Sequence, residues 1–252
     1  MKRITILSLA LMLLIALSPL NSFAQRYGGT FVFIAPYGGD IGSLNAHARH
    51  RAQDRLIHMN INRSLYRWDA VQGIPVLALA KKVDRSDDGL LYTYHIHEGV
   101  KFHNGRELVA DDFIWSYNQM VSPVAKGKAR ISSSARYMRI VEGAKAAERN
   151  ETDTISGIKK IDKYTFSIKL TGPFNPAYSL YDAGSSILPR EEVEKRGDKF
   201  GTDPVGLGPF QVEKVVRGSE VILKKFPDYY ETGKPYLDKL VYKIMVEEGS
   251  RN

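Results

Sequence analysis

The chain has 252 residues, with 36 Lys and Arg against 28 Asp and Glu, and a formal net charge of +8. It contains no cysteine, which excludes disulfide bonds, thiolate nucleophiles and cysteine-ligated metal, so its stability must come from a packed core. The basic residues are scattered among the acids and form no block of like charge, which argues against a nucleic-acid-binding protein.

The N-terminus has the three parts of a secretory signal peptide. Lys2 and Arg3 precede an apolar run over residues 4–17, and the small residues Ser22 and Ala24 suit a signal peptidase. We predict cleavage after Ala24 and export to the periplasm, with an uncleaved N-terminal anchor as the alternative. Because no cysteine follows the apolar run to carry a lipid, we expect a soluble periplasmic protein and not a lipoprotein.

The first half of the mature chain mixes strand and helix signals. It predicts, in order, a buried strand of a central sheet, a glycine-rich loop, a helix, a half-buried strand and a second helix. Their ranges are 28–35, 37–45, 51–65, 91–97 and 110–120. Acidic residues lie in the first turn of the predicted helix at 110–120, where a helix N-terminus favours negative charge.

The second half is dominated by strand and turn signals. Residues 122–154 have weak periodicity and predict irregular chain or a surface helix. Clean alternation over 158–170 predicts two strands that turn at Asp162 and Lys163. Further strands are predicted at 221–223 and 240–246.

The most specific pattern lies in residues 92–113, which read YTYHIHEGVKFHNGRELVADDF. It combines a strand, a Gly-Val-Lys-Phe step, an Asn-Gly turn and an acid-capped helix. Together with segments 43–47, 205–210 and 228–238 in the same order, it resembles the extracellular solute-binding protein family 5. These are the dipeptide-, oligopeptide- and nickel-type binding proteins of ABC importers. The resemblance covers essentially all of residues 27–250.

The resemblance implies an α/β fold of the type II periplasmic-binding-protein class, in which two lobes close on a ligand. It assigns 25–57 and 168–252 to the first lobe, a mixed sheet with flanking helices, and 58–167 to an inserted α+β domain. Family members are considerably longer, so we expect the second lobe to be absent and the chain to be a fragment or the product of a truncated or decayed gene. One lobe alone should bind weakly, because such proteins bury the ligand between both lobes.

The resemblance also implies candidate ligand-binding residues. His50, Arg51 and Ala52 are expected to run extended and pair their backbone with the ligand, since main-chain groups are common to all peptides. An Arg51 side chain facing the cleft would bind a ligand carboxylate in a bidentate pair. The alternative is that these are exposed residues that enter the following helix. The acid that captures a peptide's amino group belongs to the second lobe, so no residue here takes that role.

Four further residues are candidates for the wall of the cleft. Gly39, Ile41 and Ser43 lie on the glycine-rich loop, which either lines the cleft or packs only against its own lobe. Tyr137 either reaches the ligand from the inserted domain or is an ordinary surface aromatic residue.

Other motifs carry less specific chemistry. His95, His97 and His103 suggest a metal site, but they fall in a strand of the family pattern, on its solvent side, without an acid cluster at ligand spacing. Ser156 and Lys159 fit Ser-x-x-Lys without the companion motifs of a secreted hydrolase. We therefore expect no metal, no cofactor and no catalytic residue.

Two glycines are expected to be structural. Gly206 and Gly208 stand beside Pro209, where they should let the backbone turn sharply before a strand.

The sequence thus predicts a periplasmic substrate-binding component of an ABC importer for peptides or peptide-like solutes, truncated and monomeric. Its expected partners are the solute and an inner-membrane permease with its ATPases. Binding of a metal chelate, haem, opine or sugar is the alternative, and a secreted hydrolase is a weaker one.

Overall fold

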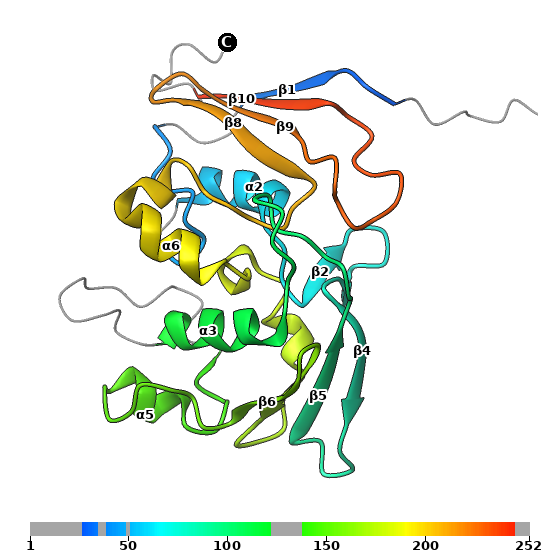
Figure 1. Ribbon diagram of the computed structural model, residues 1–252, viewed down its shortest axis with the longest axis vertical. Coiled ribbons are helices and arrows are strands. Elements are labelled where there is room, and N and C mark those ends of the chain that lie inside the picture. The colour runs from blue at the N-terminus through cyan, green and yellow to red at the C-terminus, as the bar shows by residue number, and fades with distance from the viewer. Residues whose placement is uncertain (1–26, 35–38, 49–50, 122–137, 245–252) are drawn as a thin grey trace, which may run out of the picture.

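The computed structural model describes residues 27–34, 39–48, 51–121 and 138–244. The chain folds around two four-stranded β-sheets, with a two-stranded hairpin beside them. In Figure 1 the first sheet lies at the top, the second at the lower right, and the helices lie between and beside them. The expected α/β class, with a mixed sheet and flanking helices, is confirmed.

The first sheet joins the two ends of the described chain. Its strand order is β1-β10-β9-β8, with β1 parallel to β10 and the other neighbours antiparallel. The strands are β1 (Thr30–Ile34), β8 (Phe210–Val216), β9 (Glu220–Lys225) and β10 (Lys239–Lys243). Helix α2 (Ala52–Ile61) lies below this sheet in Figure 1 and packs its apolar side chains, among them Ile57 and Ile61, into the same core.

The second sheet is antiparallel throughout, in the order β4-β5-β7-β6. Its strands are β4 (Ala80–Arg85), β5 (Leu91–Ile96), β6 (Ile158–Asp162) and β7 (Thr165–Lys169). The hairpin beside it consists of β2 (Tyr66–Asp69) and β3 (Ile74–Leu77). The predicted half-buried strand and the predicted strand pair are confirmed as β5 and as β6 with β7.

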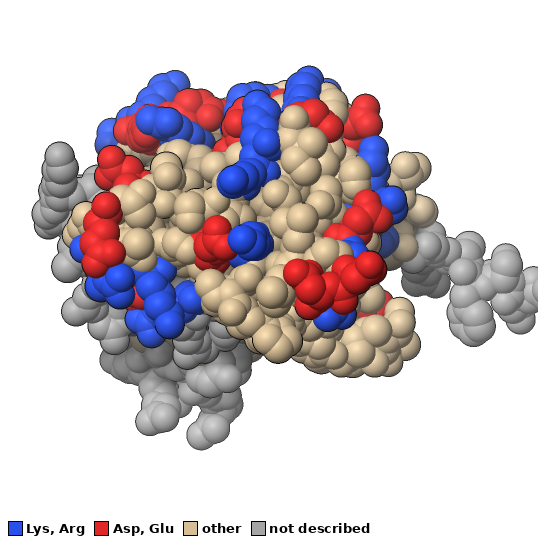
Figure 2. Space-filling model, turned by 90° about the horizontal axis from the view of Figure 1, so that it is seen from below, with Lys and Arg blue, Asp and Glu red and all other residues tan. Residues whose placement is uncertain are grey.

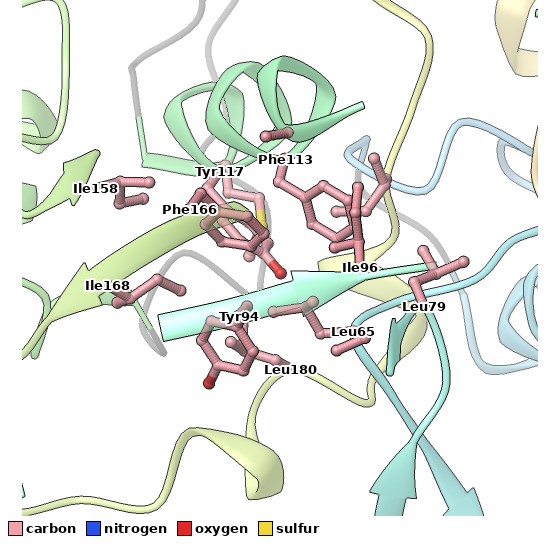
Figure 3. Packing of buried hydrophobic residues seen from close by; sticks show 14 of the residues in the cluster. Leu65, Leu79, Tyr94, Ile96, Phe113, Tyr117, Ile158, Phe166, Ile168 and Leu180 are labelled. Carbon is pink, nitrogen blue, oxygen red and sulfur yellow. The ribbon is translucent and has the colours of Figure 1, made fainter. Parts of the chain in front are cut away.

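Helix α3 (Ala110–Val121) covers the second sheet and confirms the predicted helix at 110–120. Figure 3 shows Phe113 and Tyr117 reaching from α3 toward Phe166 on β7. The rings of Phe113 and Phe166 are stacked 4.9 Å apart, and Tyr94 stacks on Phe166 at 5.5 Å. These three side chains and that of Tyr117 are fully buried. Large aromatic side chains packed in this way supply much of a core's stability.

The remaining helices are short. They are α5 (Ala144–Glu148), α6 (Arg190–Arg196) and three 3₁₀ turns at Pro176–Tyr178, Ala183–Ser185 and Gly197–Gly201. Helix α5 lies in the segment predicted as irregular chain or a surface helix: Ala144 and Ala147 are buried against the core, whereas Lys145 is exposed. Residues 122–137 lie outside the described residues.

The strand predicted at 28–35 is present as β1, but its predicted burial is wrong. Among the described strands, β1 is the edge of its sheet and pairs with β10 alone. Phe33 packs edge-on against Tyr242 of β10, but Phe31, Val32 and Ile34 are each more than half exposed, at 53%, 54% and 54%. The apolar run suits a strand with neighbours on both sides, and the described chain supplies only one.

The proposed lobe and domain boundaries at 57 and 168 remain predictions. The core of the second sheet also takes in side chains from beyond residue 168, such as Leu180, Ile187 and Phe200. The segment between β7 and β8 therefore packs against the second sheet as well as leading into the first.

The surface carries mixed charge. On the face shown in Figure 2, Lys and Arg side chains are interspersed with Asp and Glu, as in the sequence. Ion pairs such as Lys160–Asp111 at 2.6 Å join oppositely charged neighbours. No helix among the described residues is long and apolar enough to cross a bilayer.

Candidate ligand-binding surface beside the first sheet

The loop over residues 39–48, which follows β1, is fixed by one buried carboxylate. Asp54, in the first turn of α2, has no exposed surface. Its Oδ1 accepts a hydrogen bond from the Gly42 N–H at 2.9 Å, and its Oδ2 accepts one from the Arg51 N–H at 2.6 Å. A single side chain therefore caps the helix and holds the loop, and its charge is also favoured at a helix N-terminus.

A buried histidine one turn further along α2 makes a second connection. His58 Nε2 lies 3.0 Å from the Ser43 carbonyl oxygen, which can only accept, so Nε2 carries the proton. Its Nδ1 then accepts from the Asn62 amide at 3.2 Å. Gln53 adds a bond from its amide to the Asp40 carbonyl at 3.1 Å. Buried polar groups that satisfy one another in this way specify one loop conformation.

The turn between β8 and β9 holds the loop from the opposite side. The Gly218 N–H donates to Asp40 Oδ1 at 2.9 Å, and the Arg217 guanidinium donates to the Ile41 carbonyl oxygen. Arg217 also lies 3.8 Å from the Asp40 carboxylate. The loop is therefore fixed between α2 and the β8–β9 turn.

Three of the predicted site residues lie on this loop, with different surroundings. Ile41 is 3% exposed and packs in the core with Leu44 and Ile57, so its side chain faces its own lobe. Ser43 is half-buried, and its hydroxyl accepts from the Asn45 N–H at 3.2 Å. Gly39 is half-buried, with a φ of +92° that favours glycine.

Arg51 and Ala52 are exposed at the start of α2. Arg51 is extended, with φ −89° and ψ 170°, but Ala52 is the first residue of α2, so the expected extended run does not include it. The Arg51 N–H donates to Asp54 and is not available to pair with a ligand, so Arg51 can contact a ligand through its side chain. One guanidinium nitrogen, Nη1, donates to the Asp40 carbonyl at 2.9 Å, and the others make no hydrogen bond to a described residue. The predicted residues His50 and Tyr137 lie outside the described residues.

A hollow of about 170 Å³ lies next to the residues that fix the loop. Two of its lining residues contact the loop: His58 bonds to the Ser43 carbonyl, and the Ser186 carbonyl lies 2.8 Å from His47 Nε2. The other walls come from the end of α2, from β2 and from residue Tyr181. Sequence reasoning missed this hollow, although the run Asn-Arg-Ser-Leu-Tyr-Arg-Trp at 62–68 carries a signal in its closely spaced arginines and aromatic residues.

The three histidines of the metal alternative lie in separate environments. His95 Nε2 is 2.9 Å from Asp84, and the His97 ring lies 5.8 Å from that of Tyr230. His103 binds the backbone of Gly206 and Gly208. Over the part of the chain that the structure describes, no three His, Cys, Asp or Glu side chains are arranged to hold a metal ion.

His103 binds the segment 206–208, which in turn adjoins the end of α2 through the Gly208 N–H and the Ile61 carbonyl. Its Nδ1 accepts from the Gly206 N–H at 3.2 Å, and its Nε2 donates to the Gly208 carbonyl at 2.9 Å. This arrangement requires a neutral imidazole, and burial lowers the pKa of His103 to about 4.

Gly206 and Gly208 are required for a different reason from the one expected. A Cβ on Gly206 would stand 1.9 Å from the Ile61 carbonyl oxygen, and one on Gly208 would stand 2.2 Å from that of Asn60. Neither residue has a positive φ. The glycines therefore permit close approach to the end of α2, and not an unusual turn.

Comparisons with known proteins identify the family. The model of the bacterial extracellular solute-binding proteins, family 5 Middle, matches residues 75–252. The chain belongs to this family of solute-binding proteins.

Curated relatives are peptide-binding proteins by name. The dipeptide-binding protein of Escherichia coli is 34% identical over 185 residues, covering 69% of this chain and 33% of the relative. Di/tripeptide-binding protein 4 of Pseudomonas aeruginosa is 31% identical over 200 residues, covering 75% and 36%. The chain thus spans about a third of the length of these relatives.

Solved structures agree in fold. The periplasmic binding protein DppA of Helicobacter pylori, in complex with the peptide STSA, matches with a TM-score of 0.77 and 26% identity. The match covers 90% of this chain and 44% of that one. Haemophilus influenzae OppA, in complex with the peptide RPPGFSPFR, has the same fold with a TM-score of 0.78 at 21% identity. The described residues therefore form part of a peptide-binding-protein fold.

Proposed function

We propose that this chain forms the first-lobe wall of the periplasmic substrate-binding component of an ABC importer for peptides. The observation that carries the proposal is the 34% identity to a dipeptide-binding protein, over a chain whose loop at 39–48 is fixed from both sides. A wall that is ordered before the ligand arrives avoids the entropic cost of ordering it on binding.

Arg51 gives this wall its chemistry for peptides. Its exposed guanidinium keeps donors that no described residue occupies, and a free peptide carboxylate is the group that such a fork binds bidentately. The solute is then held by main-chain groups and one charge, with no covalent step. A membrane permease with its ATPases is the partner that such a component serves.

Binding strength depends on how much of the ligand is buried. Proteins of this class gain affinity by closing two lobes over the solute.

Isothermal titration calorimetry tests the cargo and the role of Arg51 together. The protein is titrated with Ala-Ala and with Ala-Ala amide, which lacks the carboxylate, and in parallel with haem, a nickel chelate and a disaccharide. We expect Ala-Ala to bind and the non-peptide solutes not to bind. Arg51→Gln should weaken Ala-Ala binding about tenfold or more, because a charge-assisted hydrogen bond is lost, and should leave amide binding unchanged.

Arg190→Gln is the matched control, because this arginine is 63% exposed and pairs with Glu194 of its own helix, α6. Binding of a non-peptide solute in place of every peptide would contradict the proposed cargo. Equal effects of the two substitutions would contradict the role of Arg51 and leave the cargo class standing.

The proposed location has its own test. N-terminal sequencing of the protein recovered from a periplasmic extract should begin at Gln25. A protein that retains Met1 and stays in the membrane fraction would contradict export by cleavage.

A further inference from the structure

Two neighbouring hollows share Arg63 and Arg67 as lining residues. The first is the hollow of about 170 Å³ described above, and the second, of about 330 Å³, is formed with the segment 229–237. Because both arginines line both hollows, the two hollows adjoin at these side chains and form one surface. We call it the arginine groove and define it by Arg63, Arg67, Trp68, Tyr181, Tyr229 and Tyr236.

Exposed aromatic side chains form the walls of the arginine groove. Trp68 is 41% exposed and lies 5.4 Å from the Tyr181 ring in the first hollow. Tyr236 is 36% exposed in the second. Tryptophan, tyrosine and arginine are the residue types that contribute most binding energy at protein interfaces. The groove therefore has the composition of a docking surface.

Arg63 is held rigidly in the arginine groove. Its Nε donates to the Tyr229 hydroxyl at 2.9 Å and its Nη1 to the Met59 carbonyl at 2.7 Å. The guanidinium lies 5.4 Å from the centre of the Tyr229 ring. A charge fixed in this way loses little entropy when it binds a carboxylate.

Little negative charge opposes these arginines. Glu231, the carboxylate that lines the second hollow, is paired with Lys234 at 2.5 Å. Arg67 has a side chain that is 43% exposed, and its nearest carboxylate partner is Asp69 at 3.8 Å. Asp69 in turn accepts the N–H groups of the following turn. The arginine groove is thus positively charged and partly apolar.

We propose that the arginine groove docks an acidic, extended peptide segment of a partner protein, with its carboxylates on Arg63 and Arg67. A small anion would fill one hollow, whereas an extended segment occupies both hollows on either side of the arginines. The proposal goes beyond the cargo site. The first hollow adjoins the loop at 39–48 through His58 and Ser186, but Arg51 lines neither hollow, and the second hollow has no lining residue from the loop or from the start of α2.

Fluorescence anisotropy tests this docking. The probe is a fluorescein-labelled nonapeptide of alternating Glu, Leu and Gly, compared with the same peptide carrying Lys in place of Glu. We expect the acidic peptide to bind and the basic peptide not to bind. Salt at 0.5 M should weaken binding, because exposed charges are screened.

Arg67→Gln is the test variant, because Arg67 is exposed and makes only a long ion pair, so the fold is kept; thermal unfolding checks this. It should weaken binding of the acidic peptide about tenfold. Arg149→Gln, with a side chain 62% exposed on a different surface, should leave binding unchanged. Equal binding of the Glu and Lys peptides, or equal effects of the two variants, would overturn the proposal.

A competition experiment separates the arginine groove from the cargo site. Saturating Ala-Ala should leave the bound acidic nonapeptide in place. Displacement by Ala-Ala would overturn the proposal, because the groove would then belong to the cargo site. Failure of Ala-Ala to bind at all would contradict the proposed cargo without affecting the nonapeptide result.

Discussion

The two sheets of this chain differ in how completely the described residues enclose them. The second sheet has α3 on one face and a continuous core around Phe166 and Tyr94, which are fully buried. The first sheet ends in β1, whose outer edge is unpaired and whose Phe31 and Val32 are more than half exposed. Apolar edge strands are usually covered or protected by charge. Among the described residues, the second sheet is therefore the more completely buried of the two.

The largest effect is expected from a change in the core of the second sheet. Phe166→Ala removes the ring that stacks on Phe113 and Tyr94, and should lower the free energy of unfolding by about 3–5 kcal/mol. Phe31→Ala is the matched change in the first sheet and should cost less than about 1 kcal/mol, because that ring is half exposed. Urea unfolding followed by circular dichroism measures both. Equal losses would contradict the difference between the sheets.

The next effect is a pH dependence of the contact between His103 and the segment 206–208. His103 has a pKa of about 4 in the folded chain, below its ordinary value of 6.5, so the folded state binds fewer protons than the unfolded state. Its contribution is fully present above about pH 6.5 and is lost as the pH falls toward 4, up to about 3 kcal/mol.

His103→Gln isolates this contribution. Glutamine keeps one donor and one acceptor without titrating, so the variant should lose less stability than the parent chain between pH 6.5 and 4. Stability measured by urea unfolding at both pH values tests this. Parallel losses in the two chains would show that His103 does not titrate across this range.

A smaller effect is expected where the chain approaches the end of α2. Gly208→Ala places a methyl group 2.2 Å from the Asn60 carbonyl and should cost about 2 kcal/mol through displacement of the backbone. Gly172→Ala is the control, because no atom stands within 4 Å of its added Cβ. It should leave the melting temperature unchanged or slightly raised. A melting temperature equally lowered in both variants would contradict the close-approach argument.

The smallest global effect is expected at the loop. In Asp54→Asn the remaining side-chain oxygen accepts from the N–H of either Gly42 or Arg51, and the new NH₂ group faces the other N–H without a hydrogen bond. This should lower the free energy of unfolding by about 1–2 kcal/mol. Hydrogen exchange should quicken over residues 39–48 and stay unchanged in β5 and β7. Faster exchange throughout the chain would show that Asp54 supports the whole fold and not the loop.

The second sheet was the more predictable part of the sequence, for a physical reason. Three elements carry local signals: the alternation in β5, the hairpin of β6 and β7, and helix α3 with acidic residues in its first turn. The strands and helix that pack against one another here come from the same stretch of chain. The apolar run of β1 carries the same local signal, but its burial depends on which strands pair beside it. Pairing with β10 joins residues more than 200 positions apart, which no local pattern encodes.

The loop and helix that carry the candidate site were predictable from the sequence, but the contacts that fix them were not. The glycines and turn-forming residues at 37–45 predict the loop, and the family resemblance predicts the extended Arg51. The buried Asp54 and His58 read in the sequence as ordinary polar residues of an amphipathic helix, because their partners are backbone groups of a distant loop. The arginine groove was not predicted for the same reason, because Arg67 and Tyr236 come together only through tertiary packing.

Hydrogen–deuterium exchange with and without peptide tests the central claim, that the fixed loop and the start of α2 form the wall that binds peptide. The protein is compared alone and with Ala-Ala at 10 mM, with Arg51→Gln as the reference variant. Exchange should slow over residues 39–55, less so in Arg51→Gln, and stay unchanged in β5 and β7. Protection confined to other segments, or absent while calorimetry reports binding, would contradict the account.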